Sequence, residues 1–537
     1  MKSFSSASYP YALTRNTVYA KKGMVATSQP LASQAGLEIL KKGGNAIDAA
    51  IATAACLTVV EPTSNGIGGD AFALVWTKGK LHGLNANGRS PKNISLEKLK
   101  EAGMEEIPAH GWIPVTVPGA PSAWAELSDR FGKLSLKEVL QPAITYAREG
   151  YPLSPTLARF WNNAYQSYRE KLTDEMFRHW FDTFAPNGRA PQVGEIWSSP
   201  NHANTLEEIA ETKAESFYRG ALAEKIAAFS EENGGYLREE DLADHQPEWV
   251  EPIKVNYRGY DVWEIPPSGQ GIVALEALNI LKGFEFPEKE SPETYHKQME
   301  AIKLAFADAH QHVTEPAHMR YSTDDLLSES YAEKRRGLIT DRALQPEAGE
   351  PTSSGTVYLA AADGEGNMVS FIQSNYMGFG SGLVVPGTGI ALQNRGHNFS
   401  MNPSHVNALA GGKKTYHTII PGFLSKGGRP IGPFGVMGGF MQPQGHVQVA
   451  MNTIDFGLNP QAALDAPRWQ WMGEKIIEVE HRFPHHIAQA LQAKGHHIRY
   501  QLEPNSFGRG QVIWRDPETG VLAGGTESRT DGTVSSW

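Results

Sequence analysis

The chain of 537 residues has one cysteine, no excess of basic residues and no long apolar run. With Cys56 alone, no disulfide can form within the chain, and its apolar neighbours favour a buried hydrophobic role. A formal net charge of −10 argues against a general affinity for nucleic acid or anionic membranes. No stretch reaches the ~20 apolar residues of a membrane helix, and the first residues lack the apolar part of a secretory signal. We therefore expect no nucleic-acid or membrane partner and a cytoplasmic location.

Several chemical motifs are missing as well. The serine-hydrolase motif Gly-x-Ser-x-Gly is absent, and the glycine turn at 66–69 lacks the full dinucleotide-binding pattern. The lysine-containing turn at 411–415 lacks the spacing of a phosphate loop. Histidines without partners at metal-ligand spacing are better interpreted as solvated: His310, His312, His485, His486, His496 and His497. We expect no cofactor and no metal.

What is present suits a large folded core with mixed helices and strands. Hydrophobic residues make up 40% and charged residues 20%, which excludes disordered and fibrous classes. The spacing of apolar residues and the capping residues predict one strand, over 71–76, and several helices, over 33–40, from Asn45 to about 57, over 136–149 and over 292–313. The pattern is that of an α/β (α+β) protein.

The chain changes character at residues 340–355, which are rich in Pro, Gly, Ser and Glu and carry no periodicity. We interpret them as an exposed segment, which is either an inter-domain linker or a processing site. A hairpin follows at once, with strands predicted over 356–362 and 368–373 and a turn between them.

Residues 356–370, Thr-Val-Tyr-Leu-Ala-Ala-Ala-Asp-Gly-Glu-Gly-Asn-Met-Val-Ser, resemble the nucleophile region of the γ-glutamyltranspeptidase family. Further blocks agree with that family in order: 65–72 (Asn-Gly-Ile-Gly-Gly-Asp-Ala-Phe), 117–120, 140–150, 257–260, 266–271 and 435–439. Each block alone is weak evidence, whereas the ordered set, which spans roughly residues 22 to 530, is specific.

The resemblance implies an N-terminal-nucleophile hydrolase with a four-layer αββα sandwich. Such a precursor cuts itself before a threonine, which here is Thr356. Fragments 1–355 and 356–537 would then stay together as a heterodimer that forms one intertwined domain.

The chemistry of such a cut can be stated from the residue types. A threonine hydroxyl is a weak nucleophile until a base takes its proton. Cleavage of Gly355–Thr356 would free an α-amino group on Thr356, and such amines titrate near ~7.7–8.0, which suits a base at neutral pH. Gly355 has no Cβ to hinder the approach of the hydroxyl to the preceding carbonyl. After an N→O acyl shift and hydrolysis, the same hydroxyl would attack a substrate amide.

The resemblance also implies roles for other residues. The backbone N–H groups of Gly438 and Gly439 would bind the oxyanion, although a simple tight turn is the alternative. Ser374 matches a hydroxyl that contacts the nucleophile, and either Asn375 or Tyr376 matches the neighbouring polar position. The pair His417 and Thr418 would contact substrate, with a core role as the alternative for His417.

Two departures from the family pattern concern the substrate. Arg89 is the candidate to bind a substrate carboxylate, but it stands two residues before Pro91 where the family has four, and an ordinary surface arginine is the alternative. Asn398 occupies the place of an acid that binds the α-ammonium of γ-glutamyl substrates, and Arg395 replaces a neutral amide nearby. An arginine repels an ammonium ion, so these changes favour acyl groups without that amine.

Three hypotheses follow. The first is an amidohydrolase or acyltransferase acting on γ-glutamyl amides such as glutathione. The second is an amidohydrolase of the glutaryl or cephalosporin acylase kind. The third, from another class, is an unprocessed binding protein without catalysis. For the first two, the partner is a small-molecule amide.

Overall fold

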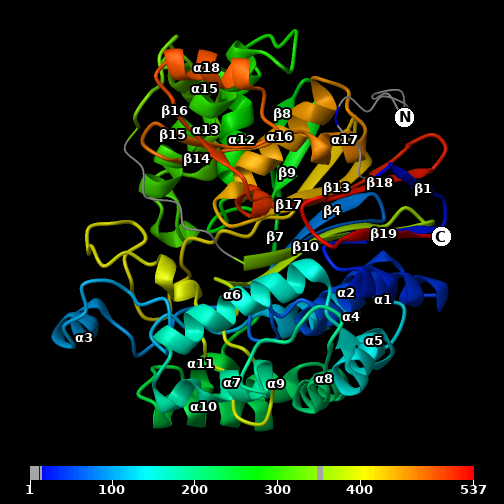
Figure 1. Ribbon diagram of the computed structural model, residues 1–537, viewed down its shortest axis with the longest axis vertical. Helices are drawn as coiled ribbons and strands as arrows, with labels where there is room; N and C mark the ends of the chain where they lie inside the picture. Colours follow the sequence, from blue (N-terminus) through cyan, green and yellow to red (C-terminus); the bar gives the residue numbers. More distant parts are fainter. Residues whose placement is uncertain (1–10, 12–14, 347–354) are drawn as a thin grey trace.

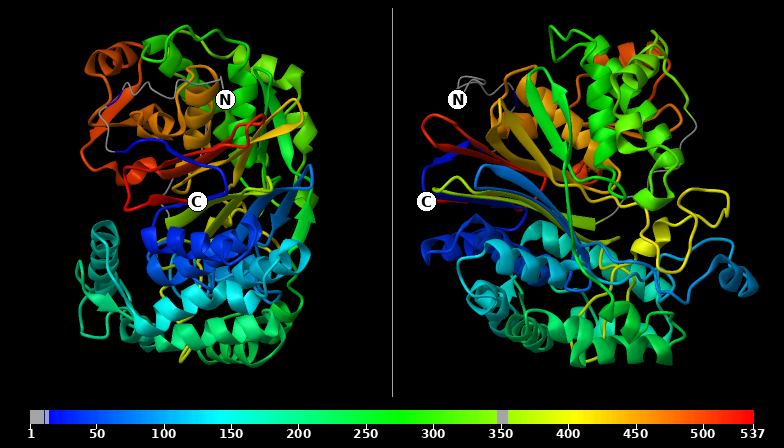
Figure 2. Two further views of the ribbon diagram at one scale, coloured as in Figure 1. Left: turned by 90° about the vertical axis from the view of Figure 1, so that its right-hand side faces the viewer. Right: turned by 180° about the vertical axis from the view of Figure 1, so that it is seen from behind.

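The computed structural model describes residues 11, 15–346 and 355–537. Figures 1 and 2 show four layers, in which two sheets lie face to face and each is covered by helices on its outer side. The predicted αββα sandwich is therefore confirmed. Among the described residues, no helix combines the length and apolar character that crossing a bilayer requires.

Both central sheets have seven strands, and every neighbouring pair within them is antiparallel. The first sheet has the order β19 (Thr533–Ser536), β2 (Gly23–Thr27), β10 (Gly355–Asp363), β11 (Met368–Tyr376), β3 (Asp70–Thr77), β4 (Lys80–Asn85), β7 (Glu248–Val250). The second has the order β1 (Val18–Ala20), β18 (Leu522–Thr526), β17 (Arg509–Arg515), β13 (Arg429–Met437), β12 (Gly422–Lys426), β9 (Tyr260–Glu264), β8 (Ile253–Tyr257).

The helices fall into two groups, one on each outer side (Figure 1). The first sheet is covered by α1 (Pro30–Lys41), α2 (Ala46–Val60), α4 (Ala120–Phe131), α5 (Leu136–Glu149), α6 (Pro155–Lys171), α7 (Arg178–Phe184), α8 (Pro200–Thr212), α9 (Glu215–Arg219), α10 (Ala221–Glu232) and α11 (Glu239–Ala243). On the side of the second sheet lie α12 (Gly271–Leu281), α13 (Pro292–His312), α14 (Thr323–Leu326), α15 (Glu329–Arg336), α16 (Met441–Ile454), α17 (Pro460–Asp465) and α18 (His485–Ala493).

Smaller elements complete the chain. They are α3 (Leu96–Glu101), the short strands β5 (Tyr151–Pro152) and β6 (Ile196–Trp197), the three-stranded sheet of β14 (Trp469–Gly473), β15 (Ile476–Glu480) and β16 (His497–Gln501), and the 3₁₀ turns η1 (Glu175–Phe177), η2 (Pro316–His318), η3 (Arg395–Asn398) and η4 (Pro504–Phe507).

The apolar layer between the two sheets shows which side chains at the start of the hairpin β10–β11 point toward the second sheet. Tyr358 and Ala360 of β10 and Ile372 of β11 belong to this core. Because side chains alternate along a strand, the even-numbered residues of both strands face the second sheet. Thr356 and Ser374 continue these two rows, so their hydroxyls lie in the gap between the sheets.

Most predicted elements are confirmed, with differences at their ends. Asn45 and Asp48 form the capping box that begins α2, α5 has the predicted bounds, and α13 ends at His312. Helix α1 begins at Pro30, earlier than predicted, because the Gln29 side chain accepts hydrogen bonds from two backbone N–H groups of its first turn. Of the predicted exposed segment 340–355, residues 347–354 lie outside the described residues.

Candidate active site

The hydroxyl of Thr356 lies beside the carbonyl that it would attack. Thr356 is fully buried, and its Oγ1 donates to O of Gly355 at 2.8 Å and lies 3.1 Å from Ser374 Oγ. Ser374 Oγ also donates to O of Gly355, at 2.7 Å, and accepts a hydrogen bond from N of Tyr376. The carbonyl oxygen of Gly355 thus accepts hydrogen bonds from the hydroxyls of Thr356 and Ser374.

An irregularity in the hairpin produces this geometry. Gly355 pairs with Tyr376 and Val357 with Gln373, so β11 carries one extra residue opposite Thr356. Such bulges redirect side chains and are common next to active sites. The φ of Tyr376 is 75°, which is unusual for a residue with a side chain. A Cβ on Gly355 would meet N of Gly378 at 2.9 Å, so the position accepts only glycine without movement of its neighbours.

The two glycines after β13 have the free donors that an oxyanion needs. Gly438 and Gly439 have φ values of 140° and 60°, in the region that favours glycine. Their carbonyls accept hydrogen bonds from the first N–H groups of α16. Within the part of the chain that the structure describes, neither glycine N–H donates a hydrogen bond.

These glycines lie at the same end of the sandwich as Thr356. A Cβ on Gly435 of β13 would touch the ring of Tyr358, and one on Gly432 would touch Met368, which pairs with Ala362 at the far end of β10. Strand β13 therefore runs across β10 in the opposite direction. Its carboxyl end, followed by Gly438, meets the start of β10.

Arg395 is a buried cation that contacts Tyr376, the residue of β11 that pairs with Gly355. Its guanidinium lies 4.4 Å from the centroid of the Tyr376 ring, and NH1 donates to Thr418 Oγ1 at 2.7 Å. Its Nε and NH2 are buried and have no hydrogen-bond partner among the described residues. Burial lowers the pKa of Arg395 to about 10, against the opposing effect of Asp70.

Asp70 forms a buried hydrogen-bonded pair with His417, the residue that precedes Thr418. His417 Nε2 lies 2.9 Å from Asp70 Oδ2, and the other carboxylate oxygen accepts from Gln393 Nε2. Burial raises the pKa of Asp70 to about 7, which Arg395 opposes, and burial lowers the pKa of His417 well below its usual value. His417 is thus held neutral within the core, which fits its alternative role better than contact with substrate.

The titration of Asp70 gives a prediction for stability. Because its folded-state pKa lies above that of a free aspartate, near ~3.9, its contribution to stability is complete below that value and is lost as the pH rises through about 7. We expect the free energy of unfolding of the wild type, relative to Asp70→Asn, to fall between pH 4.5 and 8. Denaturant unfolding of both proteins at several pH values measures this difference, and a constant difference would contradict the assignment.

The remaining predicted substrate residues lie in three different places. The side chain of Asn375 packs against the turn containing Gly66 and Gly69, so Tyr376 is the neighbour that reaches Arg395. Asn398 donates to O of Tyr416 at 3.1 Å. Ser374 contacts Thr356, Tyr376 pairs with Gly355 and contacts Arg395, and Arg395 donates to Thr418, whereas the Asn375 side chain lies against the turn of Gly66 and Gly69.

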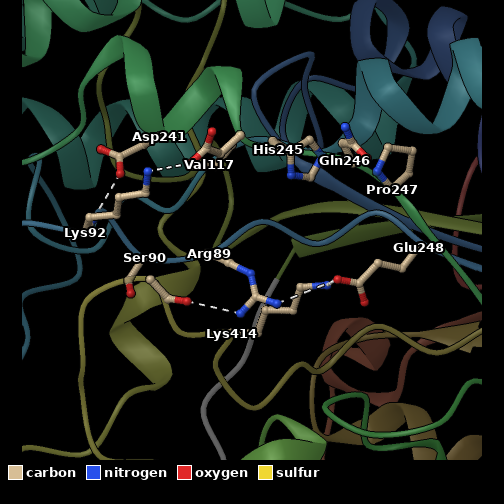
Figure 3. Close-up of a pocket in the computed structure, with 12 residues that line it drawn as sticks. Arg89, Ser90, Lys92, Val117, Asp241, His245, Gln246, Pro247, Glu248 and Lys414 are labelled. Atoms are coloured by element: carbon tan, nitrogen blue, oxygen red, sulfur yellow. Dashed lines mark hydrogen bonds and ion pairs between the residues drawn. The ribbon is translucent and has the colours of Figure 1, made fainter.

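Arg89 lies apart from this group. Its side chain is 44% exposed and forms ion pairs with Glu315 and Glu248. It lines a pocket of about 260 Å³ with Lys414 and His245, where Arg89 and Lys414 both approach Glu248 (Figure 3). Of the described residues, neither Thr356 nor Ser374 lines this pocket. Its role as a carboxylate clamp stays a prediction.

Two polar residues at the site were not assigned from the sequence. Asp70 is one, and the other is Gln270, whose Nε2 donates to O of Thr418 and to O of Gly439. Gln270 thereby joins the predicted substrate residue to the glycine turn. Both residues stand inside motif blocks and directly follow a glycine, Gly69 or Gly269, and that position was the available signal.

The prediction of a solvated histidine is wrong for His310, whose ring stacks on Phe306 and Tyr416 with its Nε2 buried, and for His496. His496 is 2% exposed, and its Nε2 lies 2.8 Å from His296 Nδ1 and 3.8 Å from Glu300. This group has ligand-like geometry, but the Lys303 ammonium donates to Glu300 and lies 3.4 Å from His496 Nδ1. The cation in this cluster is therefore a lysine. Burial of His496 is possible because all these polar groups satisfy one another.

The αββα sandwich has a threonine at the start of a central strand, near a glycine turn whose N–H groups donate no hydrogen bond among the described residues. These features define an enzyme of the N-terminal-nucleophile hydrolase type. The chain belongs to the γ-glutamyltranspeptidase family, since the family model described as gamma-glutamyltranspeptidase matches residues 32–537.

Named relatives span several activities. The glutathione hydrolase-like YwrD proenzyme of Bacillus subtilis is 39% identical over 96% of this chain and 99% of its own length. The oxamate amidohydrolase proenzyme of Klebsiella pneumoniae is 33% identical over 96% and 98%. The crystal structure of cephalosporin acylase from Bacillus halodurans has 67% sequence identity and a TM-score of 0.96, covering 99% of both chains.

Proposed function

We propose that this chain is a self-processing threonine amidohydrolase that removes acyl groups bearing a distal carboxylate and no α-ammonium, as a glutaryl or cephalosporin acylase does. The observation that carries the proposal is Arg395, a buried cation that contacts Tyr376, the partner of Gly355 in the hairpin, and has two donor nitrogens without a hydrogen-bond partner among the described residues. Similarity to the cephalosporin acylase of Bacillus halodurans supports the same choice.

Self-cleavage would begin with attack of Thr356 Oγ1 on the carbonyl carbon of Gly355. The Ser374 hydroxyl already donates to the carbonyl oxygen, where negative charge develops. Collapse of the intermediate breaks the C–N bond and leaves an ester on Thr356. The amine of Thr356 is free once that bond breaks, and water then hydrolyses the ester to give the Gly355 carboxylate and the Thr356 hydroxyl. That relatives are named proenzymes supports this sequence of steps.

The mature enzyme would repeat the attack on a substrate amide. The α-amine of Thr356 takes the proton of its own hydroxyl and later gives it to the leaving amine. The N–H groups of Gly438 and Gly439 stabilise the oxyanion of the tetrahedral intermediate. Water, or an amine acceptor, releases the acyl group from Thr356.

Charge at the acyl end would decide the substrate. A desolvated guanidinium binds a carboxylate strongly and repels an ammonium group. Asn398, which takes the place of the family's acid, is uncharged, and its amide donates to a backbone carbonyl. The arrangement therefore favours a glutaryl-like chain over a γ-glutamyl chain.

Hydrolysis of γ-glutamyl amides such as glutathione is the second candidate. Asp70 is a fully buried carboxylate close enough to Arg395 to affect its pKa, and in this candidate it would be the contact for an α-ammonium group. The similarity to a glutathione hydrolase-like protein agrees with this activity.

The two candidates predict opposite substrate preferences. Glutaryl and γ-glutamyl anilides differ only by the α-amine of the acyl group. The ratio of their hydrolysis rates therefore measures the effect of that amine. We expect kcat/KM for the glutaryl compound to be at least ~10-fold higher, because a difference of ~1.4 kcal/mol from one charge contact suffices. A preference for the γ-glutamyl compound would reject the acylase proposal and support the second candidate.

A further inference from the structure

A buried ion pair that the mechanism above does not use connects the two sides of the active site. Arg509 NH1 lies 3.0 Å from Glu61 Oε1, and the two side chains are only 10% and 6% exposed. The ring of Phe160 lies 5.0 Å from the guanidinium carbon. Cleavage before Thr356 would leave Glu61 in one fragment and Arg509 in the other.

The backbone around Arg509 contacts the glycine turn. Arg509 begins β17 and pairs with Met437, the last residue of β13. A Cβ on Gly438 would meet Cα of Gly508 at 3.0 Å, so the two backbones touch. Arg468 donates to O of Gly508 from the other side. The position of the Gly438 N–H therefore depends on where the chain at 508–509 lies.

The backbone around Glu61 contacts the bond to be cut. Glu61 caps the end of α2, and its backbone carbonyl accepts a hydrogen bond from N of Ser64 at 3.2 Å. A Cβ on Gly355 would meet Cα of Ser64 at 3.2 Å. The second carboxylate oxygen of Glu61 accepts from Ser28 Oγ, and Arg509 NH2 lies 3.5 Å from Ser64 Oγ. The turn that supports Gly355 is thus held through Glu61.

We infer that Glu61 and Arg509 are positioning residues that set the distance between the oxyanion donors and the Gly355–Thr356 bond. An apolar layer also joins the two sheets, and apolar packing has no direction. A charge-assisted hydrogen bond fixes both distance and direction, and oxyanion donors act only when they are placed within a few tenths of an ångström. This inference depends on the proposed role of Thr356.

The test compares this pair with a matched pair at a distance from the site. Arg258 and Asp455 also form a largely buried ion pair between the two fragments. Asp455 follows the last residue of α16, a helix of 14 residues, so it lies roughly 20 Å from the glycine turn at its start. We would measure the rate of self-cleavage, kcat and KM on glutaryl anilide, and Tm for Glu61→Gln, Arg509→Met and Asp455→Asn.

We expect Glu61→Gln and Arg509→Met to slow self-cleavage and to lower kcat by at least 10-fold, with KM within 2-fold of wild type. Asp455→Asn should lower Tm but leave the rates within 2-fold. The double variant Glu61→Gln/Arg509→Gln contains no unpaired buried charge, and it gives the same readouts if a single variant does not fold. Rates of the Glu61 and Arg509 variants that match those of Asp455→Asn would overturn the inference.

The outcome separates this inference from the proposed function. If Thr356→Ala is still cut, the proposed nucleophile is wrong. If Thr356→Ala stays uncut while the Glu61 and Arg509 variants are processed and turn over normally, only the positioning role is wrong.

Discussion

Replacing Thr356 by alanine is expected to leave a single chain of 537 residues and to remove activity. The Thr356 hydroxyl contacts the Gly355 carbonyl oxygen and the Ser374 hydroxyl, and alanine has no atom that can attack. Ser374 also touches that carbonyl, but it stands on β11 and cannot supply the new N-terminal amine. We expect turnover to fall by at least ~10⁴-fold, which is typical for loss of a nucleophile.

A denaturing gel and an intact mass measurement check this result. Wild type should give fragments 1–355 and 356–537, and Thr356→Ala should give one species. Thr356→Ser is the matched control, because it keeps a hydroxyl at the same position and should still be cut. Two fragments in the alanine lane would remove Thr356 as the agent of cleavage. A wild type that stays whole and inactive would support the binding-protein hypothesis.

Local sequence signals predicted the secondary structure around the nucleophile correctly. Asn45 and Asp48 determine where α2 begins by hydrogen bonds within one turn, so the capping pattern alone predicts that start. The hairpin of β10 and β11 closes over a short turn, and its pairing is also local. The position of β13 across β10 comes from residues far apart in the sequence, and only the family resemblance indicated it.

The sequence indicates a candidate site residue most directly where the requirement lies in that residue's own backbone conformation. Gly438 and Gly439 need positive φ values, and glycine is the residue that tolerates them. Arg395, Asp70 and His417 belong to three separate segments that converge in space, and no spacing in the sequence reports such contacts. His496 was assigned to solvent for the same reason, because its partners His296 and Lys303 lie on a distant helix.

The second large effect is expected from Arg395→Met. The guanidinium is the cation with unpartnered donors beside Thr418, and its removal would leave a substrate carboxylate buried without a partner. Loss of one member of a buried charge pair costs about 2–5 kcal/mol. We expect kcat/KM for glutaryl anilide to fall by roughly 10²–10³-fold, with Arg395→Lys retaining part of the rate because it keeps the charge but loses the planar fork.

The comparison that isolates the charge uses a neutral acyl chain of the same length. Hydrolysis of a valeryl anilide should change little in Arg395→Met, because that chain has no carboxylate to lose. Self-cleavage should also persist, since the acyl group in that step is Gly355. Equal losses on both anilides would indicate a damaged fold instead of a lost carboxylate contact.

Arg89 is the other arginine that the sequence offers for this role, so Arg89→Met completes the design. Its guanidinium already neutralises Glu315 and Glu248 at a half-exposed position, where solvent screens charge and an added carboxylate gains little. We expect its substitution to change the glutaryl-to-valeryl ratio far less than Arg395→Met does. If the ratio instead collapses in Arg89→Met and survives in Arg395→Met, the pocket of Arg89, Lys414 and His245 binds the acyl carboxylate. The unpartnered nitrogens of Arg395 would then act only within the core.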